Sequence, residues 1–164
     1  MATRSLLVAT DFSECSREAI SYAATLAGGL GANLVIGYVT DPNVFNSAYI
    51  ADKIGTSFLS MTAEQVRDAA NTIIGEELSV LVHSVKKNGT HCTPVILDGP
   101  PAQALTDYAT AHGCLMIVVG TRGHSNLEHF MYGSTTDRLL RLAGCPVLVV
   151  REKAVEKSGG KKKP

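Results

Sequence analysis

The chain alternates short apolar runs with longer segments in which apolar residues recur every three or four positions. The short runs cover residues 6–9, 34–39, 92–97, 114–119 and 146–150. Their length and aliphatic composition are typical of β-strands. The run at 114–119 has no polar interruption, and such continuity is typical of a strand buried on both faces of a parallel sheet.

Helical periodicity fills most of the intervals between these runs. It predicts four helices, over residues 13–30, 62–87, 101–112 and 134–143. Ser13 is the expected N-cap of the first helix, and Gly31 is its expected stop. Residues 40–60 lack a clear period, and we predict a long loop with one helical turn there. The alternation predicts an α/β fold with five mostly parallel strands, right-handed crossovers and helices on both faces.

The length indicates one domain, and the distribution of charge sets its C-terminal residues apart. The 164 residues correspond to a single domain, and their formal net charge is zero. Residues 1–150 hold nine Lys and Arg against thirteen Asp and Glu, whereas residues 151–164 hold six against two. We therefore predict a mildly acidic domain over residues 1–151 and a Lys-rich, disordered tail over residues 152–164. The domain lacks a basic footprint, so we expect no nucleic-acid partner.

The sequence also argues against a membrane or secreted protein. No run reaches the roughly 18 apolar residues of a membrane-spanning helix, and we expect no signal peptide, because the first residues lack a cleavage site. Cys15, Cys92, Cys114 and Cys145 lie far apart without a Cys-x2-Cys spacing, which disfavours disulfides and zinc. We expect a cytoplasmic protein with free thiols and no membrane partner.

Candidate chemistry lies at the carboxyl ends of the strands, where open parallel sheets bind their ligands. The segment after the fourth apolar run stands out, because it reads Gly120-x2-Gly123-x9-Gly133-Ser134. Glycines let the backbone approach a bulky anion, and the N–H groups at a helix start, the hydroxyls of that turn and Arg122 suit phosphate oxygens. Helix capping and loop punctuation explain each feature singly, but their combination favours a phosphate-binding loop.

This glycine pattern resembles the nucleotide-binding signature of the universal stress protein family. Three further segments resemble the family's opening strand and turn, its proline turn before the third helix and its closing strand: residues 6–13, 99–101 and 145–151. These segments occur in the family's order and span nearly the whole chain. The resemblance implies a Rossmann-like sheet, similar to that of the adenine nucleotide α-hydrolases, with strand order 3-2-1-4-5.

Family members with the full glycine signature bind ATP, so the resemblance implies an ATP site. Asp11, with Thr10 beside it, would contact the adenosine, the backbone of Val39 would read the adenine edge, and Val119 and Gly120 would line the ribose. The phosphates, with Mg²⁺ or Mn²⁺ between them, are expected on Arg122, Gly123, Gly133, Ser134, Thr135 and Thr136. The family commonly dimerises through its last strand, so we also expect a homodimer through residues 146–150.

Motifs that would indicate an enzyme are missing from the sequence. It contains neither a P-loop, Gly-x4-Gly-Lys-Ser/Thr, nor a Gly-x-Ser-x-Gly nucleophile elbow. His124 and His129 lie within the glycine loop, where they are either solvent-facing or able to reach a phosphate or a water. We predict a stress-response regulatory domain that binds ATP with slow or no hydrolysis. The alternatives are a nucleotide-free dimer that works through protein contacts and a weak ATPase.

Overall fold

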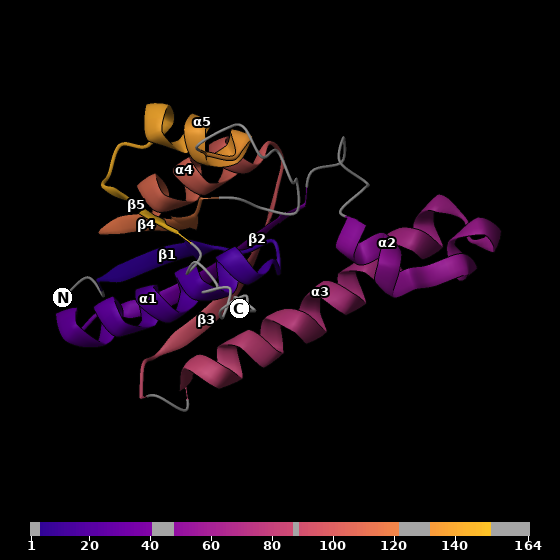
Figure 1. Ribbon diagram of the computed structural model, residues 1–164, viewed down its shortest axis with the longest axis horizontal. Helices are drawn as coiled ribbons and strands as arrows, with labels where there is room; N and C mark the ends of the chain where they lie inside the picture. Colours follow the sequence, from indigo (N-terminus) through magenta and orange to yellow (C-terminus); the bar gives the residue numbers. More distant parts are fainter. Residues whose placement is uncertain (1–3, 41–47, 87–88, 122–131, 152–164) are drawn as a thin grey trace, which may run out of the picture.

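A five-stranded, parallel sheet forms the centre of the molecule (Figure 1). The structure, a computed structural model, describes residues 4–40, 48–86, 89–121 and 132–151. The strands are β1 (Ser5–Ala9), β2 (Asn33–Thr40), β3 (Cys92–Asp98), β4 (Met116–Gly120) and β5 (Val147–Val150). Their order is β3-β2-β1-β4-β5, which confirms the predicted fold class and places the switch point between β1 and β4.

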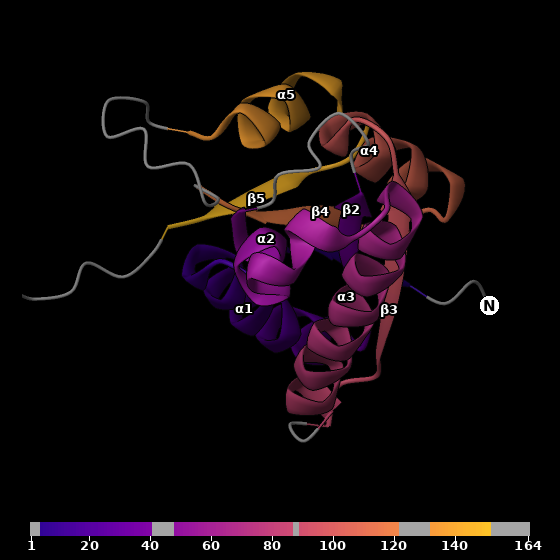
Figure 2. The same ribbon diagram turned by 90° about the vertical axis from the view of Figure 1, so that its right-hand side faces the viewer.

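Helices cover both faces of the sheet (Figure 2). They are α1 (Glu14–Leu30), α2 (Ala48–Ile54), the 3₁₀ helix η1 (Gly55–Ser60), α3 (Ala63–Lys86), α4 (Pro101–Ala111) and α5 (Ser134–Leu142). α1 and α3 contribute to the hydrophobic core on one face, and α4 and α5 contribute to the core on the other. Within the described ranges, no helix combines the length and apolar character needed to cross a membrane.

The central strands are apolar on both sides because both of their faces are covered. Leu6 and Val8 enter the core beneath α1 and α3, whereas Leu7 between them enters the core beneath α4 and α5. All three side chains are fully buried. β4 alternates in the same way, with Val118 on one side and Val119 on the other, as its continuous apolar run predicts.

Local signals at the ends of α1 behave as predicted. The Ser13 side chain accepts a hydrogen bond from the backbone N–H of Ser16 at 3.2 Å, which makes Ser13 the N-cap. Gly31 ends the helix in the left-handed conformation, with φ of 59°, where a glycine carries no Cβ penalty. The cap fixes where the β1–α1 turn delivers its side chains.

The prediction of a long loop over residues 40–60 is wrong for the part that the structure describes. Ala48–Ile54 form α2, and Gly55–Ser60 form η1. Ile50 is buried in the core beneath α1 and α3 and Ile54 packs against that core, so tertiary contacts stabilise a helix whose own sequence shows little periodicity. Gly55, with φ of 64°, is the first residue of η1 and marks the change of direction after α2. Residues 41–47 and 152–164 lie outside the described residues.

Candidate functional site

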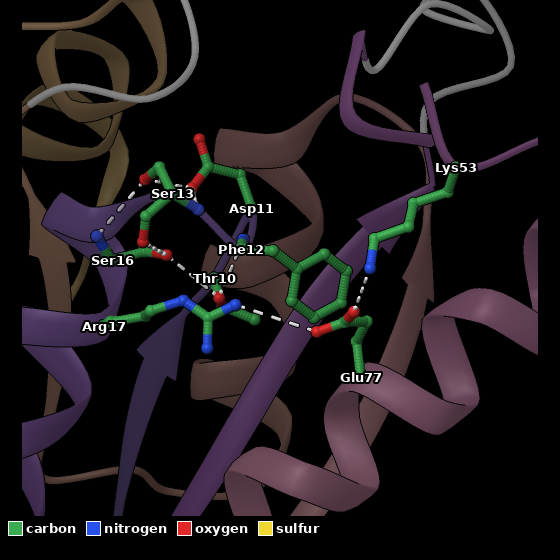
Figure 3. Close-up of polar contacts among 8 residues, drawn as sticks. All are labelled: Thr10, Asp11, Phe12, Ser13, Ser16, Arg17, Lys53 and Glu77. Carbon is green, nitrogen blue, oxygen red and sulfur yellow. Dashed lines mark hydrogen bonds and ion pairs between the residues drawn. The ribbon is translucent and has the colours of Figure 1, made fainter. Parts of the chain in front are cut away.

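The turn between β1 and α1 places Asp11 at the carboxyl edge of the sheet. One oxygen of Asp11, Oδ1, accepts hydrogen bonds from the backbone N–H of Ser13 at 3.0 Å and from the Ser13 hydroxyl (Figure 3). Thr10 is buried, and its hydroxyl oxygen accepts the backbone N–H of Phe12 at 3.0 Å while pairing with the Ser16 hydroxyl at 3.0 Å. The buried Thr10 side chain therefore stabilises the turn, and Asp11 lies half-buried at the surface of the turn.

Phe12, which the sequence analysis did not single out, supports this turn. Its φ of 67° lies in the left-handed region that side-chain-bearing residues seldom adopt. The Phe12 ring is buried and stacks on Tyr38 of β2, with ring centroids 4.9 Å apart and planes inclined by 17°. Such strain costs about 1–3 kcal/mol and persists only where surrounding contacts hold it. The stacked rings and the Thr10 hydroxyl supply those contacts.

At the end of β2, the backbone of Val39 points toward the space beyond β1. The backbone N–H of Thr10 donates to the Gly37 carbonyl at 2.9 Å, so Gly37 faces β1. Gly37 is also paired with Ala9, the last residue of β1. Because backbone groups alternate sides along a strand, Val39 faces the same way as Gly37 but beyond the last residue of β1. Its N–H and C=O are thus directed into the region above the β1–α1 turn.

At the end of β4, Gly120 lies against the first turn of α1. A Cβ at Gly120 would lie 2.7 Å from Cys15 Sγ and 3.1 Å from the Cys15 carbonyl oxygen. The site therefore requires glycine for close approach of backbone to backbone. The Gly120 carbonyl accepts a hydrogen bond from the Thr136 hydroxyl of α5 at 2.9 Å. Gly120 thus ties together β4, α1 and α5 at the switch point.

The first turn of α5 begins beside this junction. The backbone N–H of Gly133 donates to the Thr121 carbonyl at 2.8 Å, and Gly133 is the N-cap. Gly133 has no side chain, and the first turn has no side-chain cap. Ser134 is exposed, Thr135 is half-buried and Thr136 is buried. The turn therefore presents backbone N–H groups and the Ser134 and Thr135 hydroxyls at the edge where Asp11 and Gly120 also lie.

Asp11, Val39 and Gly120 lie at or just beyond the carboxyl ends of the neighbouring strands β1, β2 and β4, and Gly133 is tied to the residue after β4 through Thr121, whereas the Val119 side chain is buried beneath α4 and α5. Four residues of the glycine loop that carry predicted or alternative roles, Arg122, Gly123, His124 and His129, lie outside the described residues. The described ranges contain no cluster of three or more His, Cys, Asp or Glu side chains suited to hold a metal ion.

The cysteines are free thiols, and burial makes two of them less acidic. All four are free, as the sequence predicts, and three of them are buried. Burial raises the pKa of the Cys92 thiol to about 11, although the nearby charge of Lys86 acts in the opposite direction. Burial likewise raises the pKa of Cys145. Thiols with raised pKa values are poor nucleophiles and poor metal ligands at neutral pH.

A match to a family of known proteins identifies the chain. The model of the universal stress protein family matches residues 2–151. The chain belongs to this family. Among its relatives, the universal stress protein YxiE of Bacillus subtilis is 30% identical over 149 residues, covering 89% of this chain and 97% of that protein. MJ0531 of Methanocaldococcus jannaschii is 28% identical over 153 residues, covering 91% of this chain and 82% of that protein.

Solved structures of universal stress proteins share the fold. UspA of Lactobacillus plantarum has a TM-score of 0.72 and 25% identity, covering 92% of this chain and 99% of that one. A universal stress protein of Archaeoglobus fulgidus, solved in complex with dAMP, has a TM-score of 0.64 and 20% identity, covering 92% of this chain and 99% of that one. A further universal stress protein, solved with cAMP, has a TM-score of 0.57 and 22% identity, covering 92% and 98%.

Proposed function

We propose that this universal stress protein binds ATP at the switch point between β1 and β4 and acts as a nucleotide-dependent regulator. Hydrolysis is slow or absent, and the regulatory state depends on whether the site is filled. The observation that carries the proposal is the first turn of α5, which has no side-chain cap and is tied to the end of β4 through Thr136 and Gly120. N–H groups at a helix N-terminus attract phosphate.

Contacts of the described residues suggest a role for each part of the first turn of α5. Backbone N–H groups after Gly133 and the hydroxyls of Ser134 and Thr135 would bind phosphate oxygens. The Thr136 hydroxyl donates to the Gly120 carbonyl, so this side chain would hold the first turn of α5 in place. Only the backbone N–H of Thr136 would then be offered to phosphate. For Arg122 and Gly123, the proposed contact with the phosphates rests on the sequence alone.

The adenosine part of the ATP would lie over the β1–α1 turn. The carboxylate of Asp11 offers several acceptor lone pairs, so it can receive ribose hydroxyls as well as the Ser13 donors. The backbone N–H and C=O of Val39 match the donor and acceptor on an adenine edge. Val119 and Gly120 would form the wall beside the ribose.

A divalent cation would arrive with the nucleotide. Mg²⁺ prefers oxygen ligands and retains several waters, and it is commonly held by phosphates with one or two protein groups. The described residues provide no cluster of three acidic, Cys or His side chains. We therefore propose that Mg²⁺ or Mn²⁺ is bound mainly by the phosphates, and not by a site that is formed before the nucleotide binds.

Two further findings support an adenine nucleotide in a reducing compartment. Universal stress proteins with the same fold have been solved with dAMP and with cAMP, which are both adenine nucleotides. The four cysteines of this chain are free. Free thiols fit a cytoplasmic location, where disulfides seldom persist.

Nucleotide released from the purified protein tests the proposal. Denaturation followed by anion-exchange chromatography of the supernatant is expected to yield ATP or its hydrolysis product ADP. Steady turnover of Mg·ATP that is lost in the His124→Ala variant would instead indicate an ATPase. Protein that releases no nucleotide and shows no binding of added Mg·ATP in calorimetry would overturn the proposal.

We also propose that the protein is a homodimer through β5, because the two edges of the sheet differ. The backbone N–H of Ile117 donates to the Pro146 carbonyl at 2.9 Å, so Pro146 faces β4 and the alternate residues Val147 and Val149 face outward. On the other edge, the same alternation turns Pro94 of β3 outward, where it lacks an N–H donor. Proline at an edge blocks strand pairing, whereas β5 keeps its donors.

Replacement of Val149 by proline should therefore dissociate the dimer without unfolding the domain. The change removes an outward donor and leaves the bonds between β4 and β5 in place. Analytical ultracentrifugation at micromolar concentration should show a shift from dimer to monomer. The matched control is Ile96→Pro, which alters an outward position of β3 and should leave the dimer intact. A wild-type monomer, or a Val149→Pro variant that still dimerises, would contradict the assignment.

A further inference from the structure

One carboxylate outside the predicted site joins three helices. Glu77 of α3 lies 3.7 Å from Nη2 of Arg17 on α1 and 3.2 Å from Nζ of Lys53 on α2. Figure 3 shows the two cationic side chains reaching the Glu77 carboxylate from different directions. The Glu77 side chain is 19% exposed, against 38% for Arg17 and 48% for Lys53. The anion at the centre of this cluster is therefore its most buried member.

The contact between Arg17 and Glu77 crosses a gap between helices. A groove of about 560 Å³ runs between α1 and α3. Its lining includes Arg17, Ile20 and Ala24 of α1 and Leu81 and Val85 of α3. Arg17 thus lines this groove and also pairs with Glu77 on α3. Arg17 is also one turn from the β1–α1 turn, because its backbone N–H donates to the Ser13 carbonyl at 3.0 Å.

The contact between Lys53 and Glu77 holds the segment that follows β2. The chain leaves β2 just after Val39, and α2 lies beyond the carboxyl ends of the strands (Figure 1). Ile50 of α2 is buried in the same core cluster as Phe12 and Tyr38. Ile50 and Ile54 thus pack α2 against the core that holds the stacked rings, and the ion pair of Lys53 with Glu77 ties α2 to α3.

We propose that Glu77 is a positioning residue for nucleotide binding, holding α2 in place beside the adenosine end of the site through Lys53 and Arg17. The inference rests on the proposed function. Without the Glu77 charge, the positive charges of Arg17 and Lys53 would repel each other with no carboxylate between them. The helix α2 would then spend more time away from its position against α3. A looser α2 beside the stacked rings of Phe12 and Tyr38 would weaken binding of the nucleoside, because the binding-competent state would be populated less.

The test compares Glu77→Gln with Glu76→Gln, which removes the charge of the adjacent, exposed carboxylate on the same helix. Dissociation constants for ATP and for adenosine are measured by calorimetry on the full chain. Glu77→Gln should raise both constants by the same factor, about three- to tenfold, because the loss arises at the nucleoside end. Hydrogen exchange of the α2 amides should accelerate in that variant. Glu76→Gln should change neither measurement.

Salt and a double-mutant cycle separate positioning from a general loss of packing. Adenosine is uncharged, so any weakening of its binding by NaCl reports ion pairs within the protein. Wild-type affinity for adenosine should fall with salt, and that of Glu77→Gln should not. Lys53→Met should weaken adenosine binding in the wild type but add little in the Glu77→Gln background.

The outcomes distinguish this inference from the function on which it rests. A wild-type protein that binds neither ATP nor adenosine overturns the proposed function and the role of Glu77 together. A wild-type protein that binds ATP, with Glu77→Gln equal to Glu76→Gln in affinity, overturns only the role of Glu77. Additive effects of Lys53→Met and Glu77→Gln would likewise overturn the coupling between these two side chains.

Discussion

Replacement of Gly120 by alanine is expected to destabilise the protein by about 1–3 kcal/mol and to weaken nucleotide binding. The new Cβ would lie 2.7 Å from Cys15 Sγ and 3.1 Å from the Cys15 carbonyl oxygen, which belongs to the helix backbone and has little freedom to move. The strain would separate the end of β4 from the start of α1. Because Thr136 donates to the Gly120 carbonyl, α5 would shift as well. Urea denaturation and calorimetry with ATP measure the two effects.

Two further variants test the cause of this effect. Gly144→Ala serves as the matched control, because a Cβ at Gly144 has no atom within 4 Å and should cost little. In a Cys15→Ala background the sulfur contact is gone and only the backbone contact remains, so Gly120→Ala should cost less there. A Gly120→Ala variant with wild-type stability would show that β4 and α1 can separate freely, contrary to the close approach inferred here.

Much of the fold could be predicted because local patterns and tertiary structure agree. Short apolar runs become strands when both faces of a sheet are covered, and the run at 114–119 led directly to the central strand β4. Ser13 and Gly31 act through their own backbone surroundings, so sequence alone places the ends of α1. The order of the strands came from the family resemblance, since parallel neighbours are far apart along the chain.

Features that depend on contacts between distant segments could not be predicted. The helix α2 forms around Ile50, whose burial depends on residues of other elements. The stack of Phe12 on Tyr38 joins two strand ends, and no spacing along the chain indicates it. The same holds for Glu77, whose two cationic partners lie on different helices.

Thr136 illustrates how the candidate site itself was only partly predictable. The sequence indicates three hydroxyls at a helix start, all available to phosphate. In the structure the Thr136 hydroxyl donates to Gly120, because β4 ends where α5 begins. The Thr136 side chain therefore links α5 to β4, and under the proposed function only the hydroxyls of Ser134 and Thr135 would meet the phosphates.

Replacement of Ser134 by aspartate should weaken ATP binding about a hundredfold while leaving the fold intact. Ser134 is the first residue of α5, where a negative charge favours the helix dipole, so Ser134→Asp should keep or raise stability by about 0.3–1 kcal/mol. The same charge would repel the phosphates, and a unit-charge repulsion of about 4 kcal/mol at 4 Å, partly screened by solvent, corresponds to a roughly hundredfold loss of ATP affinity. Adenosine, which carries no phosphate, should bind nearly as well as before.

A loss of affinity for ATP without a loss of affinity for adenosine would place the phosphates at the start of α5. Ser79→Asp places the same charge at an exposed position within α3 and should leave ATP affinity unchanged. Calorimetry with ATP and adenosine on both variants, beside thermal denaturation, gives the comparison. Equal affinity for ATP in Ser134→Asp and in the wild type would place the phosphates elsewhere than α5. A parallel loss of adenosine affinity would mean that the substitution disturbs the whole site, because a charge acting on the phosphates alone cannot weaken a ligand that lacks them.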